Sequence, residues 1–316
     1  MQVNLAQAIV LLKSGGVVAI PTETVYGLAA DATNEAALRQ VYAIKQRPAD
    51  NPLIVHIADA SFVNDWAAEF PPLAQKLAQA FWPGPFTLVL RAKDSVSNIV
   101  RGNQPTVALR VPSHPTALQL LKQSGLALAA PSANKFTQLS PTTAAHVATG
   151  LGDSVPVLDG GACKVGIEST IVSVEGEDWR MLRLGMVSET SIEALAGRPA
   201  LKKQVNLTKA LPRVPGQHLL HYSPKTPVKL FQSREALISF VKTSQKSCAA
   251  LLFGAGECPS CPYLQLSNQA TQAAEALYGT LHKLDALQVE QLLVEMPPRM
   301  TEWAAITDRL SRAAHV

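Results

Sequence analysis

The stretch NEAALRQVYAIKQRPADNPLIVHI, residues 34–57, predicts a helix, a cationic loop and a strand in direct succession. Asn34 is a favourable N-cap, and the apolar residues that follow it recur at near-helical spacing. Pro48 and Pro52 end that helix and turn the chain, and the run PLIVHI, residues 52–57, predicts a buried strand. A helix that leads directly into a buried strand is typical of an α/β domain.

The same alternation continues on both sides of this stretch. It predicts helices over residues 3–13, 34–45, 60–68, 71–82, 114–124, 142–149 and 188–196. It predicts strands over residues 17–20, 52–57, 87–92, 106–111, 126–130, 155–159, 169–174 and 179–184. We therefore expect residues 1–200 to form one α/β or α+β domain around a large, twisted, mixed sheet.

A second, smaller domain is predicted after a proline-rich segment. Residues 201–227 hold Pro212, Pro215, Pro224 and Pro227, which favour an extended linker. In residues 228–316, strands at 228–231, 249–253 and 291–296 alternate with helices at 234–243, 269–285 and 302–314. This alternation predicts a small Rossmann-like α/β domain with a doubly wound parallel sheet.

The composition limits the classes of protein that fit. With 47% apolar and 16% charged residues among 316, the chain can build sizeable cores and is not predicted to be disordered. A formal charge of +4 accommodates anionic substrates without demanding a nucleic-acid surface. No apolar run approaches the roughly 18 residues of a membrane span, and four cysteines in so long a chain indicate a reducing compartment. We therefore expect a cytoplasmic protein that does not associate with membranes.

Lys45 and Arg47 are the first candidates for a binding site. They lie at the predicted end of helix 34–45, where cations also interact favourably with the helix dipole. The prolines that follow hold both cations in a rigid loop. Because a guanidinium fork suits phosphate oxygens and an ammonium supplies a mobile point charge, the pair predicts a phosphate site.

Polar side chains also gather where several predicted strands end. They are Thr22, Glu23, Thr24 and Tyr26, then Ser132, Asn134, Ser140 and Thr142, then Glu168, Ser169 and Thr170, and the isolated arginines Arg110 and Arg183. A buried arginine is costly unless it meets an anion, and ligands gather at the carboxyl ends of strands in open α/β sheets. Each turn can also be a simple capped turn, and Thr142 is expected to be an N-cap. Together these side chains predict a cleft for a nucleotide and a small acid.

Other short motifs predict no further chemistry. The chain has no G-x-x-x-x-G-K-[ST] loop, and the glycines of LLFGAGECP, residues 251–259, lack the third glycine of a dinucleotide fingerprint. CPSC, residues 258–261, is a single cysteine pair, so no metal site is predicted. His114, His146 and His282 are expected to be helix residues.

Six motifs occur in an order that resembles one family. They are PTETVYGLA, KQRPADNPLIVH, ALRVP, APSAN with SPTTA, DGG with GIESTIV, and PGQHLLHYSPKTPV. Together they resemble the YrdC-type threonylcarbamoyl-AMP synthases (L-threonylcarbamoyladenylate synthases) in their longer, two-domain form. The resemblance implies a nucleotidyltransferase that joins L-threonine, bicarbonate and ATP into threonylcarbamoyl-AMP and pyrophosphate. It also implies that a downstream threonylcarbamoyl-transferase complex completes threonylcarbamoyladenosine beside the anticodon of tRNA.

The resemblance implies roles for individual residues as well. Lys45 and Arg47 match the family's catalytic cations. The ATP-binding positions are Arg47, Asn51, Ser132, Asn134, Ser140, Arg183, His221 and Tyr222. The threonine-binding positions are Thr24, His56, Arg110, Ala130 and Ser169. Mg²⁺ is expected to accompany ATP, without assigned protein ligands.

The linker has a place in this resemblance too. The family places it across the mouth of the catalytic cleft, with the His221–Tyr222 pair near the nucleotide. Three positions depart from the family pattern: Leu184 stands where proline is usual, Thr137 where glycine is usual, and Leu220 where arginine is common.

Other functions remain open at this point. One is a non-catalytic RNA- or nucleotide-binding module with the same fold and a weak direct contact with RNA. Another is the related domain of the hydrogenase-maturation carbamoyl-transfer machinery, which would require repeated C-x-x-C motifs that this sequence lacks.

Overall fold

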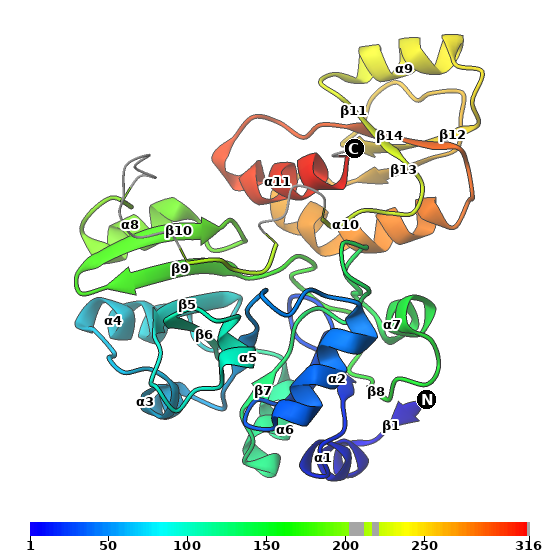
Figure 1. The fold of residues 1–316 in the computed structure, drawn as a ribbon. Helices are drawn as coiled ribbons and strands as arrows, with labels where there is room; N and C mark the ends of the chain where they lie inside the picture. The colour runs from blue at the N-terminus through cyan, green and yellow to red at the C-terminus, as the bar shows by residue number, and fades with distance from the viewer. Residues whose placement is uncertain (202–211, 217–220, 315–316) are drawn as a thin grey trace.

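The computed structural model describes residues 1–201, 212–216 and 221–314, which form two sheets with helices packed on them (Figure 1). The strands are β1 (Gln2–Val3), β2 (Val18–Ile20), β3 (Gly27–Asp31), β4 (Ile54–His56), β5 (Phe86–Arg91), β6 (Thr106–Arg110), β7 (Leu128–Ala129), β8 (Val157–Leu158), β9 (Thr170–Glu175), β10 (Asp178–Arg183), β11 (Val228–Phe231), β12 (Cys248–Phe253), β13 (Tyr263–Leu266) and β14 (Gln291–Glu295). The helices are α1 (Leu5–Lys13), α2 (Glu35–Lys45), α3 (Val63–Trp66), α4 (Pro72–Phe81), α5 (Asn98–Arg101), α6 (Pro115–Ser124), α7 (Ala144–Leu151), α8 (Glu189–Ala196), α9 (Arg234–Thr243), α10 (Ala270–Asp285) and α11 (Ala304–Ala313), with short 3₁₀ turns η1 (Ala60–Phe62) and η2 (Thr301–Trp303).

The larger sheet has ten strands in the order β1-β8-β2-β3-β7-β4-β6-β5-β9-β10. Parallel pairs such as β4 with β6 occur beside antiparallel pairs such as β5 with β6. The prediction of a large mixed sheet is therefore confirmed. In the register of β4 and β6, His56 stands opposite Arg110 at the carboxyl end of both strands. Neighbouring strands thus bring two of the candidate site residues side by side.

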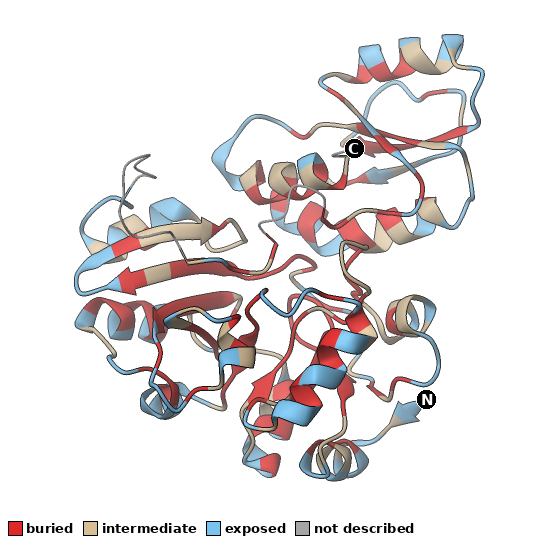
Figure 2. Ribbon diagram, in the orientation of Figure 1, coloured by how far each residue is buried: buried red, intermediate tan, exposed pale blue. Residues whose placement is uncertain are grey.

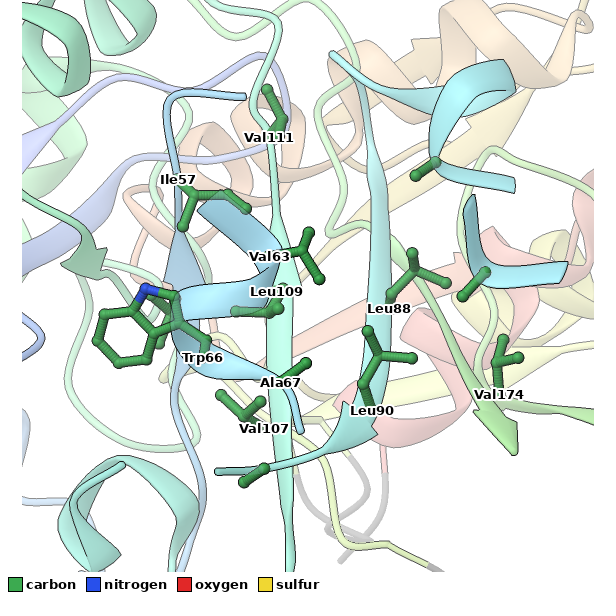
Figure 3. Close-up of a cluster of buried hydrophobic side chains, with 14 of the residues drawn as sticks. Ile57, Val63, Trp66, Ala67, Leu88, Leu90, Val107, Leu109, Val111 and Val174 are labelled. Atoms are coloured by element: carbon green, nitrogen blue, oxygen red, sulfur yellow. The ribbon is translucent and has the colours of Figure 1, made fainter. Parts of the chain in front are cut away.

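The largest core lies between this sheet and the helices that cover it. Figure 3 shows Val63 and Trp66 of α3 among Leu88, Leu109 and other side chains of the strands. Val63, Leu88 and Leu109 have no exposed surface, and burial of such side chains supplies most of the stabilisation of a domain. Figure 2 shows the same pattern across the molecule, with buried residues along the strands and exposed ones on the outer helix faces.

The smaller sheet has the order β11-β14-β12-β13, and all of its paired strands are parallel. Leu237 of α9 packs in a cluster on one face. Helices α10 and α11 cover the other face and lie between this sheet and the larger domain (Figure 1). The predicted parallel α/β domain is confirmed. The predicted domain limits are residues 200 and 227. Segments 202–211 and 217–220, which lie between these limits, are outside the described residues, and Leu220 is one of them.

Local predictions differ from the structure in a few places. Residues 21–33 were expected to form a turn, but Gly27–Asp31 is strand β3, which pairs antiparallel with β2. The N-cap of α7 is Thr143 rather than Thr142, because the Thr143 side chain accepts the His146 amide. His114 is the N-cap of α6 rather than a residue inside the helix. None of the described helices combines the length and apolarity that a membrane crossing requires.

Candidate active site

A cleft opens where the carboxyl ends of β4 and β6 meet the loops that follow β2 and β7. Its walls are formed by Thr22, Thr24, Val25, Gly27, Arg47, Ile54, His56, Arg110, Ala130, Pro131, Ser132, Glu168, Arg183, Pro215, Gly216, His221 and Tyr222. Its free volume is only about 40 Å³. Residues from several strand ends of the larger sheet and residues of the linker therefore close around one small space.

Arg110 is buried at the floor of the cleft and is partly neutralised by the protein itself. Its Nη2 donates to Glu23 Oε1 at 2.6 Å, its Nη1 to Thr24 Oγ1 at 2.9 Å and its Nε to the Gly84 carbonyl at 3.2 Å. Burial acts to raise the pKa of Glu23, but Arg110 outweighs it, so the pKa is lowered and the carboxylate stays ionised. A guanidinium has five N–H donors, so Arg110 keeps donors for a carboxylate ligand.

His56 lies next to Arg110 and is neutral. Burial, followed by the positive charge of Arg110, lowers the pKa of His56 to about 3. Its Nδ1 has no hydrogen-bond partner within the described residues. A neutral imidazole beside a guanidinium can shape a pocket for a small amino acid without repelling its amine.

Arg47 and Arg183 carry positive charge into the cleft without a carboxylate partner in the described part of the chain. Arg47 donates from Nη2 to the Pro52 carbonyl at 2.9 Å, and its Nε has no partner. Arg183 donates to the Ser169 carbonyl at 3.0 Å, to Ser169 Oγ at 3.0 Å and to the Pro215 carbonyl at 3.1 Å. Burial lowers the pKa of Arg47 to about 10, which still leaves the group charged at neutral pH. Two buried guanidiniums in one cleft are suited to bind an anion.

Lys45 lies behind the wall rather than on it. It is 1% exposed, and its Nζ donates to the Ser132 carbonyl and, at 2.6 Å, to the Asn134 carbonyl. Burial, followed by the charge of Arg47, lowers its pKa well below the usual value. In this conformation Lys45 fixes the loop after β7, so a direct phosphate contact would require one of these bonds to be exchanged.

The linker contributes two aromatic side chains to the cleft. The rings of His221 and Tyr222 are 4.1 Å apart, and both side chains are buried. The Tyr222 hydroxyl and His221 Nδ1 have no partner among the described residues. Gly216 has φ +88°, and a Cβ there would lie 2.1 Å from the Tyr222 hydroxyl, so only glycine fits beside this ring.

The structure brings most of the predicted site residues to the walls of the cleft. Those on the walls are Thr24, Arg47, His56, Arg110, Ala130, Ser132, Arg183, His221 and Tyr222. Those behind the walls are Lys45, Asn51, Asn134, Ser140 and Ser169. The second group is buried and supports the first, as Ser169 does for Arg183. Their roles toward ATP and threonine remain predictions.

Glu23 and Glu168 were expected among the polar side chains of the cleft, but neither carboxylate was assigned a role there. Glu23 pairs with Arg110, and Glu168 lies on the wall and pairs with Arg309 through a contact of 2.9 Å. A signal was available in the sequence, because Glu168 follows Ile167 and precedes an apolar strand, where an acid must be buried. A buried acid requires a cationic partner. Arg309 itself could not have been identified, because it lies 141 residues further along the chain.

No three metal-ligating side chains gather among residues 1–201, 212–216 and 221–314. All four cysteines are unpaired. Glu168, the carboxylate on the cleft wall, is already engaged by Arg309 and Ser140. The described residues therefore do not form a protein-built metal site.

Comparison with known proteins agrees with this architecture. The family model described as "Telomere recombination" (Sua5/YciO/YrdC) matches residues 10–185, and the model described as "Threonylcarbamoyl-AMP synthase, C-terminal domain" matches residues 187–315. The chain is 38% identical to threonylcarbamoyl-AMP synthase of Bacillus subtilis, over 98% of this chain and 93% of the relative. It is 35% identical to the enzyme of the same name from Pyrococcus abyssi, over 96% of this chain and 92% of the relative.

The fold matches a solved structure over nearly its full length. The crystal structure of P. abyssi Sua5 complexed with L-threonine superimposes with a TM-score of 0.90 at 32% identity, covering 99% of this chain and 97% of that one. Both the sequence match and the structural match include the larger domain and the smaller parallel domain. The chain therefore belongs to the threonylcarbamoyl-AMP synthase family, in its two-domain Sua5 form.

Proposed function

We propose that the protein synthesises threonylcarbamoyl-AMP from L-threonine, bicarbonate and ATP, with release of pyrophosphate. The observation that carries this proposal is the presence of Arg47, Arg110 and Arg183 around one small cleft, two of them without a carboxylate partner in the described residues. Such a cleft suits one carboxylate and a chain of phosphates. The family supports the choice of substrates, because a two-domain relative was solved with L-threonine.

The proposed chemistry follows from the two ends of the cleft. Arg110, held by Glu23 and Thr24, directs its remaining donors at the threonine carboxylate, which leaves the amine free. The amine adds to carbon dioxide and releases a proton to solvent, or condenses with bicarbonate and releases water, to form a carbamate. The carbamate oxygen then attacks the α-phosphorus of ATP. The bond from the α-phosphorus to the bridging oxygen breaks, and pyrophosphate departs toward Arg47 and Arg183. Catalysis of this kind depends on positioning and charge stabilisation.

Lys45 and the loop after β7 have a supporting part in this proposal. The loop carries Ser132 and Asn134, and both of its carbonyls near Lys45 are fixed by the ammonium. We expect Ser132 to contact the triphosphate and Lys45 to exchange a carbonyl for a phosphate oxygen when ATP binds. Mg²⁺ is proposed to enter with the nucleotide, since Mg²⁺ commonly binds through substrate phosphates and water rather than a protein cage.

The product is proposed to serve tRNA modification. A carboxylic–phosphoric anhydride is labile, so a transferase complex must accept the threonylcarbamoyl group soon after it forms and pass it to the adenosine beside the anticodon. We place this reaction in the cytoplasm, in keeping with four unpaired cysteines. A weak direct contact with RNA is part of the same proposal.

The decisive test is pyrophosphate release. We expect release from ATP only when L-threonine and bicarbonate are both present, together with a product of the mass of threonylcarbamoyl-AMP. Pyrophosphate release that needs neither substrate, or nucleotide binding without any release, would instead favour a nucleotide-binding module. Binding of tRNA with a steep salt dependence and no turnover would favour the RNA-binding alternative.

A further inference from the structure

Arg309 belongs to the smaller domain, yet its side chain contacts Glu168 and Tyr222, two residues on the wall of the cleft. The side chain is 1% exposed. Its Nε donates to Glu168 Oε2 at 2.9 Å, and its Nη2 donates to the Leu184 carbonyl at 2.9 Å. The guanidinium carbon lies 4.9 Å from the centre of the Tyr222 ring. One side chain of α11 thus contacts three separate segments that surround the cleft.

Glu168 is the centre of this group of contacts. Besides Arg309, its carboxylate accepts hydrogen bonds from Ser140 Oγ at 2.6 Å and from the Tyr278 hydroxyl at 3.1 Å. Burial acts to raise the pKa of Glu168, but Arg309 and Arg183 outweigh it, so the pKa is lowered and the carboxylate remains charged. A negative charge therefore lies on the wall of a cleft that is otherwise built for anions.

The two domains are already joined by apolar packing, so the contacts of Arg309 are not required for that purpose. The interface already holds apolar packing, in which Val25, Leu139 and Ile167 of the larger domain cluster with α10 and α11. A buried ion pair usually contributes little more than apolar residues of the same volume would. The smaller domain also provides an internal comparison, because the buried Arg234 and the half-buried Glu295 form a second ion pair at 2.8 Å that includes no residue of the cleft.

We propose that Arg309 is a positioning residue of the nucleotide site, and that the smaller domain completes this site by neutralising and orienting Glu168. With Arg309 in place, the cleft presents Arg47 and Arg183 to the triphosphate without an opposing free carboxylate. Without it, Glu168 loses its main counter-charge and the bond that sets its orientation, so the charge that it carries beside the phosphates is unopposed. This inference rests on the proposed function, since it takes the anion in the cleft to be ATP.

The test compares four variants of the full chain: Arg309→Met, Arg309→Lys, Arg309→Met with Glu168→Gln, and the control Arg234→Met. ATP affinity is measured by calorimetry, KM and kcat by pyrophosphate release, and Tm by thermal unfolding. We expect Arg309→Met to raise the Kd and KM for ATP by at least about tenfold. Adding Glu168→Gln should recover about threefold or more, because the opposing charge is gone. Arg309→Lys should lie between Arg309→Met and the wild type, because an ammonium supplies charge but cannot reach Glu168 and Leu184 together.

The control variant Arg234→Met distinguishes a specific effect on ATP binding from a general loss of stability. Arg234→Met removes a buried arginine from an ion pair, so it should lower Tm as Arg309→Met does, yet change the Kd for ATP by less than about twofold. Equal ATP constants in Arg309→Met and Arg234→Met, or no recovery in the double variant, would overturn the inference. If Arg309→Met does not fold, wild-type ATP affinity in Arg309→Lys overturns it. Failure of the proposed function would appear differently, as a wild type that binds ATP but releases no pyrophosphate with threonine and bicarbonate, and the Kd values would still decide the role of Arg309.

Discussion

Two polar atoms of the linker's aromatic pair have no hydrogen-bond partner among the described residues, Nδ1 of His221 and the hydroxyl of Tyr222. Tyr222 is 1% exposed, so its hydroxyl is shielded from bulk water. An unsatisfied buried polar group costs about 1–3 kcal/mol, and such groups persist mainly where a ligand completes them. The Tyr222 hydroxyl is therefore placed to donate to an oxygen of the nucleotide.

The first prediction concerns Tyr222→Phe. Because the hydroxyl has no partner among the described residues, the free energy of unfolding should stay the same or rise slightly. ATP binding should weaken by about 1–2 kcal/mol, roughly tenfold, through the loss of one charge-assisted hydrogen bond. Chemical denaturation and calorimetry measure the two quantities. Tyr278→Phe is the matched control, because its hydroxyl donates to Glu168 and its loss should lower stability by about 1 kcal/mol. Reduced stability in Tyr222→Phe with unchanged ATP affinity would contradict this reasoning.

A second prediction separates the two ends of the cleft. Arg110→Lys should weaken threonine binding by about 1.5–3 kcal/mol and weaken ATP binding less. The reason is that a point charge cannot form a forked contact with a carboxylate. Arg183→Lys should show the reverse order. Calorimetry of each ligand with each variant gives four affinities to compare. The same order of loss in both variants would show that the division between threonine and phosphate ends is wrong.

At the scale of single residues, the sequence predicted which side chains require a charged or polar partner better than it predicted which partners they contact. Arg110 and Arg183 were predictable because isolated arginines in apolar strands require an anionic or polar partner. Whether the partner was a ligand or the protein could not be known, and Glu23 now accounts for part of the charge of Arg110. Lys45 illustrates the same limit, since its contacts with residues 132 and 134 depend on how two distant loops meet.

Helices α7 and α10 meet through a pair of histidines, one from each domain. The rings of His146 and His282 are stacked with centres 4.0 Å apart. His146 Nδ1 accepts the Thr142 amide at 3.3 Å, which requires this nitrogen to be unprotonated. Burial, followed by the neighbouring His282 and Lys283, lowers the pKa of His146 to about 4, and burial also lowers the pKa of His282. Both histidines are therefore neutral in the folded protein at physiological pH.

The third prediction is that acid weakens this contact between elements. The unfolded chain binds a proton at His146 near its ordinary pKa of 6.5, whereas the folded chain resists protonation until about pH 4. The free energy of unfolding should therefore fall as pH decreases from about 6.5 to about 4. His146→Gln should reduce that slope and keep a hydrogen-bonding side chain. Denaturation series across this pH range measure it.

His114 provides the control for this prediction. Burial also lowers its pKa, but it caps α6, and its Nε2 lies 3.2 Å from the Gly160 carbonyl within the larger domain. His114→Gln should remove only its own share of the slope and leave the interdomain contact intact. A slope in His146→Gln equal to that of the wild type would rule out the histidine pair as its source.

Helices and strands were predictable where residues close by in the sequence, such as caps and prolines, determine where they begin and end. Helix α2 is bounded by the Asn34 cap and ends before Pro48, and α9 occupies its predicted range because Ser233 caps it. Strand β3 was overlooked because its short apolar run follows a polar turn directly, and β13 because an exposed edge strand has no buried pattern. The order of the ten strands could not be predicted, since pairings such as β1 with β8 join distant parts of the chain.

At the scale of the whole molecule, the linker and the smaller domain convert an open sheet edge into an enclosed site. Pro215, Gly216, His221 and Tyr222 close the cleft from one side, and Arg309 braces Tyr222 from behind. Two domains were predictable from the restart of the strand–helix pattern after the prolines. Their packing was not, because both its apolar and its polar contacts join residues more than a hundred positions apart.

This enclosure leads to the last prediction, which concerns how ATP enters. A free volume of about 40 Å³ is far below the roughly 300–1,000 Å³ of pockets that hold molecules of this size. The aromatic pair His221–Tyr222 must therefore move before the nucleotide can be seated. In rapid mixing, the observed rate of ATP binding should rise with ATP concentration and then level off at the rate of this movement.

The double variant His221→Ala with Tyr222→Ala tests whether movement of these two rings causes the plateau in the rate of ATP binding. It removes the two rings that fill the cleft, so its observed rate should rise linearly with ATP over the same range. Its equilibrium affinity should fall, because the contacts that retain the nucleotide are lost together with the obstruction. A variant that only disrupts the site would lower the affinity and keep the plateau in the association rate. Faster association together with weaker binding therefore identifies the two rings as the obstruction. A rate that rises linearly in the wild type as well would mean that the cleft admits ATP without displacement of the pair.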